Sequence, residues 1–184
     1  GLEASLPMIK KGENGSTFFE PKVQLIYSIP TINNEPTEDS NHTELSYSNF
    51  HELDRSYGMN YNENGFRIQT SITSSHKSFY GTRSNLFLGH ISRFNGNNAK
   101  SLGSGFDTKN STNIGSIEIE LKDDISLTSS LVTNQNFQIT RNNVQLNYKT
   151  NSFDFYSKYF YKQKNEENGF AIDRSELDIG TTIQ

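Results

Sequence analysis

The sequence predicts an all-β fold, an antiparallel meander of about eight or nine long strands. Two observations carry this prediction. The 184 residues include three Ala beside 22 Asn, 23 Ser and 15 Thr, so the best helix former is scarce and turn residues are abundant. Hydrophobic side chains also recur at every second position in several runs, which is the period of a strand with one apolar and one polar face. A helical bundle is therefore excluded.

Each expected strand rests on its own alternating run. Between Gly65 and Ser75, Phe66 and Ile68 fall on one face and Arg67 and Gln69 on the other. Residues 117–121 alternate Ile or Leu with Glu, and residues 144–149 alternate an apolar or aromatic residue with Gln, Asn or Lys. The remaining expected strands, in chain order, are 18–27, 56–61, 82–94, 125–133, 153–163 and 170–183.

Matching faces across a turn predicts the length of two hairpin loops, because directly opposed residues point to the same side of an antiparallel sheet. A three-residue loop over 122–124 sets Leu121 opposite Ile125 and keeps the apolar faces together. A four-residue loop over 149–152 sets Tyr148 opposite Phe153 in the same way. Other connections, 30–46, 95–113 and 164–169, are longer or strongly polar.

The strand lengths favour a membrane barrel over a sandwich, although alternation alone leaves both open. The runs 65–75 and 153–163 are 11 residues each, which is longer than the usual 5 to 6 and fits the roughly 9 to 11 of a tilted transmembrane strand. In a barrel the apolar face turns to lipid, and Glu118, Glu120, Arg67 and Gln69 face a wet interior. An Arg in place of Gln69 is then expected to be nearly neutral. The alternative is a soluble sheet with aromatic residues in its core.

Charge and motif content exclude several functions. The 21 acidic and 17 basic residues give a formal charge of -4 without a basic tract, so we expect no nucleic-acid partner. The absence of Cys excludes disulfides, thiolate metal sites and thiol nucleophiles within the chain. Glu63 and Arg67 could form an ion pair or be solvated separately. We expect no enzyme activity, no cofactor and no metal, since zinc spacing is missing among His42, His51, His76 and His90.

Five regions of the sequence resemble, in order, a known family. Residues 19–27 read FEPKVQLIY and precede a Pro-containing acidic loop. The later runs read SNF at 48–50 with DRSYG at 54–58, ENGFR at 63–67, LFLGHISR at 86–93 and RNNVQL at 141–146. This series resembles the lipopolysaccharide-assembly outer-membrane protein LptD, also called the organic solvent tolerance protein (OstA/Imp).

The resemblance implies a fragment of the C-terminal barrel region of that family, in the outer membrane of a Gram-negative bacterium. Residues 1–184 would be a single segment of a large transmembrane β-barrel, an open, curved sheet in isolation, without the family's periplasmic jelly-roll domain and gate strands. The residues that match the family's motifs, and to which it implies a structural role, are Glu20, Pro21, Arg55, Gly58, Glu63, Gly65, Arg67, Gly89 and Arg93.

The implied function is assembly of lipopolysaccharide in the outer leaflet, performed by a barrel wall that encloses a transport path without bond chemistry. The implied partners are lipopolysaccharide, a plug lipoprotein like LptE, periplasmic lipopolysaccharide bridge proteins that act through the missing domain, and outer-membrane lipids. Two alternatives remain: a soluble secreted or surface β-sheet domain that binds a partner, and a segment of a porin-like channel.

Overall fold

The computed structural model describes residues 1–29, 44–53, 55, 63, 65–94, 111–122, 124–164 and 172–183. These residues form ten strands and no helix. None of them belongs to a helix long and apolar enough to cross a membrane. The strands are β1 (Leu2–Ser5), β2 (Met8–Gly12), β3 (Gly15–Ser28), β4 (Gly65–Ser78), β5 (Thr82–Arg93), β6 (Thr112–Leu121), β7 (Ile125–Asn134), β8 (Ile139–Lys149), β9 (Phe153–Lys162) and β10 (Arg174–Ile183).

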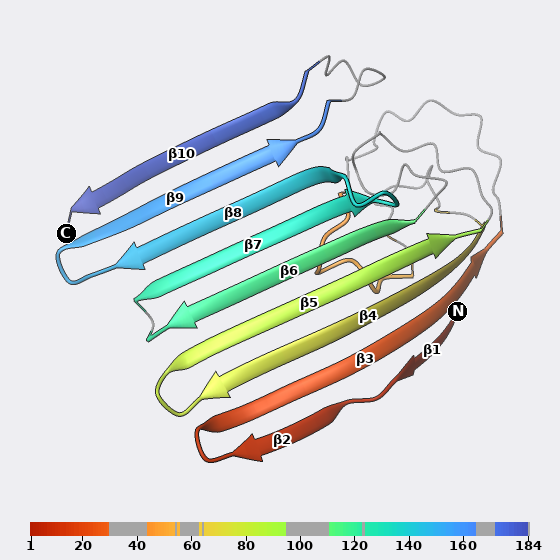
Figure 1. The fold of residues 1–184 in the computed structure, drawn as a ribbon, viewed down its shortest axis with the longest axis horizontal. Coiled ribbons are helices and arrows are strands. Elements are labelled where there is room, and N and C mark those ends of the chain that lie inside the picture. Colours follow the sequence, from red (N-terminus) through yellow and green to blue (C-terminus); the bar gives the residue numbers. More distant parts are fainter. Residues whose placement is uncertain are drawn as a thin grey trace.

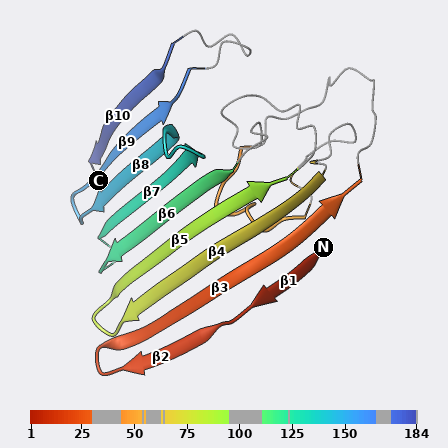
Figure 2. The same cartoon turned by 45° about the vertical axis from the view of Figure 1, so that its right-hand side comes forward.

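All ten strands belong to one antiparallel sheet in the order β1-β3-β4-β5-β6-β7-β8-β9-β10, with β2 also paired to β3. From β3 onward each strand pairs with its successor in the chain, which is a meander (Figure 1). The sheet is twisted and curved, with β1 and β2 at one edge and β10 at the other (Figure 2). The prediction of an open all-β meander is confirmed.

One predicted hairpin register is confirmed and the other is wrong. Leu121 pairs with Ile125, as face matching requires. Tyr148, however, pairs with Phe155, two residues beyond the predicted partner Phe153. The loop is closed by Thr150, whose amide donates to the Phe153 carbonyl at 2.9 Å and whose hydroxyl accepts from the Phe153 amide at 3.0 Å. Both registers keep the faces together, so alternation could not distinguish them.

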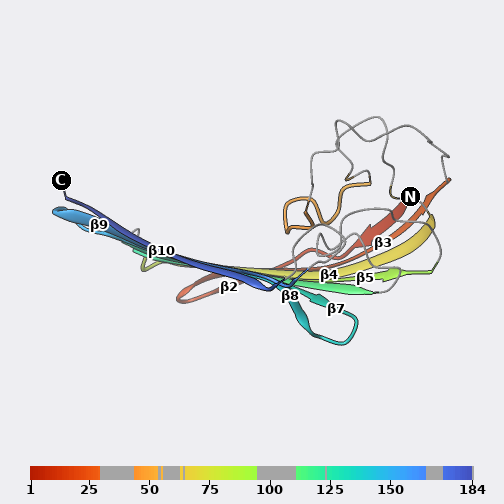
Figure 3. The same cartoon turned by 90° about the horizontal axis from the view of Figure 1, so that it is seen from above.

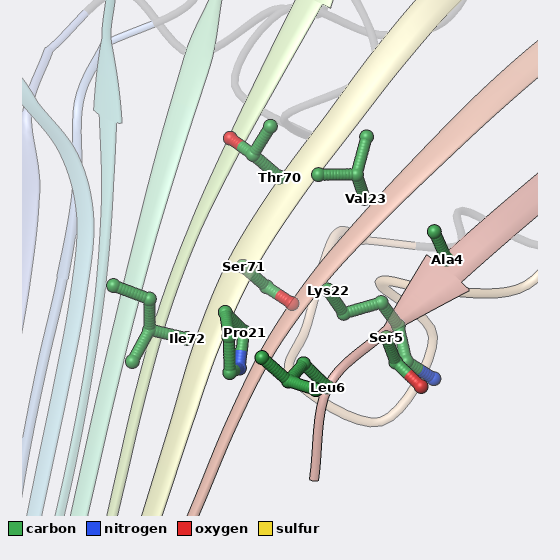
Figure 4. Close-up of a pocket in the computed structure, with 9 residues that line it drawn as sticks. All are labelled: Ala4, Ser5, Leu6, Pro21, Lys22, Val23, Thr70, Ser71 and Ile72. Atoms are coloured by element: carbon green, nitrogen blue, oxygen red, sulfur yellow. The ribbon is translucent and has the colours of Figure 1, made fainter.

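The sequence pattern missed the first two strands. The pairing of β1 and β2 with β3 keeps one register, since Ser5 pairs with Lys22 and Met8 with Phe19. Between them the ladder is interrupted at Pro7, which has no amide hydrogen to donate. The interruption leaves a hollow of about 440 Å³ between Leu6, Pro21 and Ile72 (Figure 4). The expected strand 56–61 lies outside the described residues.

The two faces of the sheet differ in what covers them. The face that carries residues 44–53 is called the inner face, and the opposite one the outer face; the side view separates the two (Figure 3). Many outer-face positions are apolar and open, as Ile72 (40% exposed) and Leu88 (49% exposed) illustrate. Further exposed apolar residues in register with them are Val23, Leu25, Tyr27, Leu86, Ile117, Leu121, Leu146, Tyr148, Phe153, Tyr159, Leu177, Ile179 and Ile183. Polar residues such as His90 and Asn113 lie between these apolar residues on the same face.

The buried core lies on the inner face, between the sheet and residues 44–53. It consists of Leu45, Phe50, Phe87, Ile91, Ile114 and Val132. Gln69, which the sequence placed toward a wet interior, is fully buried beneath this segment. The expectation that Gln69 faces a wet interior is therefore wrong, and the reason for expecting Gln69→Arg to be neutral no longer holds, because Gln69 is packed against other groups and not solvated.

Candidate functional site

The candidate site is the inner-face segment, which we define as residues 44–53, together with the side chains that hold it. A side-chain hydrogen-bond pattern gives this segment its shape. The Ser46 amide donates to Asn49 Oδ1 at 2.8 Å, and Asn49 Nδ2 donates to the Glu44 carbonyl at 2.8 Å. The Phe50 amide donates to the Tyr47 carbonyl at 3.4 Å. Asn is well suited to such turns because its amide replaces main-chain partners.

Phe50 is the apolar anchor of the inner-face segment. Its side chain is fully buried and makes an edge contact with Phe87 on β5, with ring centroids 5.1 Å apart. The ring also lies against Gly89 of β5, where a Cβ would come within 2.6 Å of the Phe50 ring. The glycine thus provides space that any other residue would fill.

Glu44 anchors the start of the segment to the far strands. Its carboxylate forms ion pairs with Arg141 on β8 and, at 2.8 Å, with Lys162 on β9. Arg141 also donates to the Leu45 carbonyl. Burial alone would raise the pKa of Glu44, but the hydrogen bond from Lys162 and the charge of Arg141 hold it below its ordinary value. Ion pairs therefore hold the start of the inner-face segment over β8 and β9.

His51 connects the other end of the segment to β3 and β4. Its Nδ1 lies 3.2 Å from Gln24 Oε1 and its Nε2 lies 2.9 Å from Ser71 Oγ. Gln24 Nε2 also donates to the His51 carbonyl at 3.1 Å. Burial, followed by the charge of Lys22, lowers the pKa of His51. A neutral imidazole matches these contacts, with Nδ1 donating to the amide oxygen and Nε2 accepting from the hydroxyl.

The densest part of the site is a buried charge cluster, in which three guanidinium groups surround the carboxylate of Glu63. Arg55 donates to both Glu63 oxygens, with Nε–Oε2 at 2.9 Å and Nη2–Oε1 at 2.6 Å. Arg67 lies at 3.3 Å on β4 and Arg93 at 3.2 Å on β5. Burial by itself would raise the pKa of Glu63, yet the three arginines lower it to about 2.

Gln69 joins this charge cluster to the rest of the site. With its amide oriented to suit its neighbours, its oxygen accepts from Arg55 and Arg67, each at 3.2 Å. Its nitrogen then donates to the Phe50 carbonyl at 3.2 Å and to Gln24 Oε1 at 2.7 Å. The charge cluster, the inner-face segment and β3 therefore share one hydrogen-bond network.

The structure brings four of the sequence-predicted site residues into contact, namely Arg55, Glu63, Arg67 and Arg93. Gly65 begins β4 at φ 94°, a conformation that favours glycine. Glu20 and Pro21 lie apart on β3, paired with Thr73 and Ile72. Gly58 lies outside the described residues.

Sequence reasoning missed Glu44, Phe50, Gln69 and Arg141 as parts of the site. Phe50 and Arg141 lie in the SNF and RNNVQL runs of the resemblance, and those runs were the available signal. Glu44 lies in an acidic, polar stretch that alternation does not resolve. Its contacts with Arg141 and Lys162 span 97 and 118 residues of sequence.

The site is built to hold backbone and charge in place. Within the described residues, no group of three or more His, Asp or Glu side chains is arranged to hold a metal ion. The carboxylate of Glu63 is enclosed by arginines, and its side chain is only 3% exposed. A carboxylate buried in this way is not accessible to a substrate. Its ion pairs hold the segments that carry the arginines in place.

Two comparisons bear on the family of this chain. No curated protein matches the chain. The model of the family described as "LptD: LPS transport system D" matches residues 1–183, which is nearly the entire chain. The chain therefore belongs to the LptD family.

Proposed function

We propose that this chain is a wall segment of an outer-membrane barrel that encloses a transport path for lipopolysaccharide. Its family acts in lipopolysaccharide transport at the outer membrane of Gram-negative bacteria. The observation that carries the proposal is the division of the sheet into two faces, with apolar residues open on the outer face and buried charges beneath residues 44–53 on the inner face. A wall between lipid and a polar interior requires this division.

The lengths of the connections support an orientation for the wall. At one end of the strands the connections are short, namely 13–14, 79–81, 122–124 and 150–152. At the other end, 29–64, 94–111 and 163–173 are long, whereas the fourth connection, 135–138, has only four residues. Outer-membrane barrels have short periplasmic turns and long extracellular loops. The inner-face segment belongs to a long connection and would narrow the path near its extracellular side.

The proposed partners follow from the two faces. Outer-membrane lipids would contact the outer face. A plug lipoprotein of the LptE kind would fit the polar inner face of β6 to β10, which carries charges of both signs, such as Glu118, Lys158 and Asp178, beside uncharged polar residues. Periplasmic bridge proteins would deliver lipopolysaccharide through a separate domain. The chain would act by enclosing this path, without making or breaking bonds.

Single-cysteine labelling tests whether the two faces of the sheet contact water and lipid. The chain contains no Cys, so an introduced Cys is its only labelling site. In a cysteine-free form of the full-length natural protein, Asn143→Cys on the inner face should react in intact outer membranes with a small water-soluble maleimide. Val144→Cys, its neighbour on the outer face, should react only after detergent is added. Equal labelling of both positions, with the protein in the soluble fraction, would support a soluble binding domain instead.

Depletion of the full-length protein tests the transported substrate. Loss of newly made lipopolysaccharide from the cell surface supports the proposal. Ion conductance by the purified protein, combined with normal lipopolysaccharide delivery in depleted cells, would point to a porin-like channel.

A further inference from the structure

A second feature of the inner face lies outside the charge cluster. Two rows of paired residues cross three adjacent strands, β4, β5 and β6. The first row consists of Thr73, Phe87 and Ser116. The second row consists of Ser75, Asn85 and Glu118. Tyr47 of the inner-face segment forms the wall above them. Together they line a hollow of about 180 Å³, which we call the Tyr47 hollow.

The apolar part of the Tyr47 hollow is aromatic. Phe87 is 3% exposed, and its ring meets the Tyr47 ring edge-on, with centroids 4.9 Å apart and planes at 65°. Tyr47 itself remains 54% exposed. An exposed, supported tyrosine ring offers a flat surface for C–H groups and a hydroxyl for hydrogen bonding.

The polar part of the Tyr47 hollow has unused hydrogen-bonding capacity. Asn85 Nδ2 donates to Glu118 Oε2 at 3.1 Å, which leaves a second carboxylate oxygen and the amide oxygen available. Among the described residues, the hydroxyls of Thr73, Ser75 and Ser116 have no side-chain hydrogen-bond partner. Three hydroxyls, an amide and a carboxylate therefore surround one aromatic wall.

We propose that the Tyr47 hollow binds one neutral sugar ring. Both donors and acceptors line it, as a polyhydroxylated ligand requires, and the Tyr47 ring suits the C–H face of a pyranose. Within the part of the chain that the structure describes, the one charged residue that lines the hollow is Glu118, which is negative, and the nearby Arg83 is already paired with Glu120 at 2.9 Å. The hollow therefore disfavours a phosphate group, which is also negative. The volume is well below the roughly 300 to 1,000 Å³ of drug-sized sites, which limits the ligand to a single ring.

The identity of the molecule that carries the sugar depends on the proposed function. A saccharide-bearing lipid that follows the inner face would pass this hollow, and the hollow would give its headgroup a weak, transient contact. Binding of a free sugar to the hollow does not depend on transport, so the two ideas can fail separately.

Saturation-transfer NMR on the full-length protein in detergent tests the site, with methyl glucoside, methyl galactoside and N-acetylglucosamine as neutral probes and glucose 1-phosphate as the anionic probe. We expect saturable binding of at least one neutral probe and weaker binding of the phosphate. Tyr47→Leu and Glu118→Ala should each lower the affinity for the neutral probe by about tenfold, because each removes one aromatic or charged contact.

Glu120→Ala is the matched control, because Glu120 lies on the same strand and face but outside the hollow. It should change the affinity by less than about twofold, and all variants should keep the heat-modified gel mobility of the parent. The proposal is overturned if no neutral probe binds, if the phosphate binds more tightly, or if Tyr47→Leu and Glu118→Ala bind as the parent does. Intact lipopolysaccharide delivery with no sugar binding would remove this inference and leave the proposed function in place.

Discussion

The ring of Phe50 occupies the position where a side chain at Gly89 would lie. A Cβ on Gly89 would come within 2.6 Å of Phe50 Cε2 and 2.7 Å of Cζ, and within 2.9 Å of Ile114 Cγ2. Both neighbours are buried core residues, so neither can move aside freely. The glycine is therefore required by close packing of the inner-face segment on β5.

Gly89→Ala should destabilise the full-length protein by about 1 to 3 kcal/mol, because the methyl group overpacks the contact with Phe50. Gly115→Ala is the control, since its Cβ would have its nearest contact at an ordinary 3.7 Å from Leu88. That variant should be neutral or slightly more stable, as Ala restricts the unfolded chain. Urea unfolding in detergent measures both. Equal effects at the two positions would refute the packing of Phe50 on β5.

Glu63→Gln should be strongly destabilising, by about 3 to 5 kcal/mol, because it leaves three buried guanidinium groups without their carboxylate. Glu120→Gln is the control: its partner Arg83 is 53% exposed, and the loss of such a surface pair costs roughly 1 kcal/mol or less. The two variants are compared by their urea midpoints. A loss for Glu63→Gln as small as that for Glu120→Gln would show that the cluster is solvated in the folded protein.

Stability should fall at acidic pH because of Glu63. Its folded pKa of about 2 lies below the ordinary value of 4.5, so its contribution is complete above pH 4.5 and is lost as the pH falls from there toward 2. The pKa of Glu44 is also lowered, so its contribution has the same sign. Unfolding midpoints measured between about pH 6 and about pH 3 should fall more steeply in the parent than in Glu63→Gln. Parallel curves would contradict this assignment.

Val144→Arg and Asn143→Arg test the two faces at neighbouring positions of β8. Val144 is in register with outer-face residues and Asn143 with inner-face residues. An arginine on the lipid face near the middle of a strand should cost about 2 to 4 kcal/mol, whereas one facing the interior should cost little. Folding into vesicles, followed by denaturant titration, measures the difference. Similar losses at both positions would mean that the outer face does not contact lipid.

The sequence by itself determined the fold class, most strand positions and the two faces. Each of these depends on side-chain alternation within one strand, which is a local property. It determined register only to within two residues, because a shift of two keeps every side chain on its face. Leu121 and Ile125 pair as predicted, whereas Tyr148 pairs two residues away from the expected partner.

Only the tertiary structure decided what lies on the inner face. Alternation marked Arg67 and Gln69 as polar, but could not show that residues 44–53 cover them. That burial depends on contacts between distant parts of the chain: Glu44 with Arg141 and Lys162, and Phe50 with the space left by Gly89. An isolated polar strand position is equally compatible with water. It becomes part of a core when folding brings partners that satisfy its charges and hydrogen bonds.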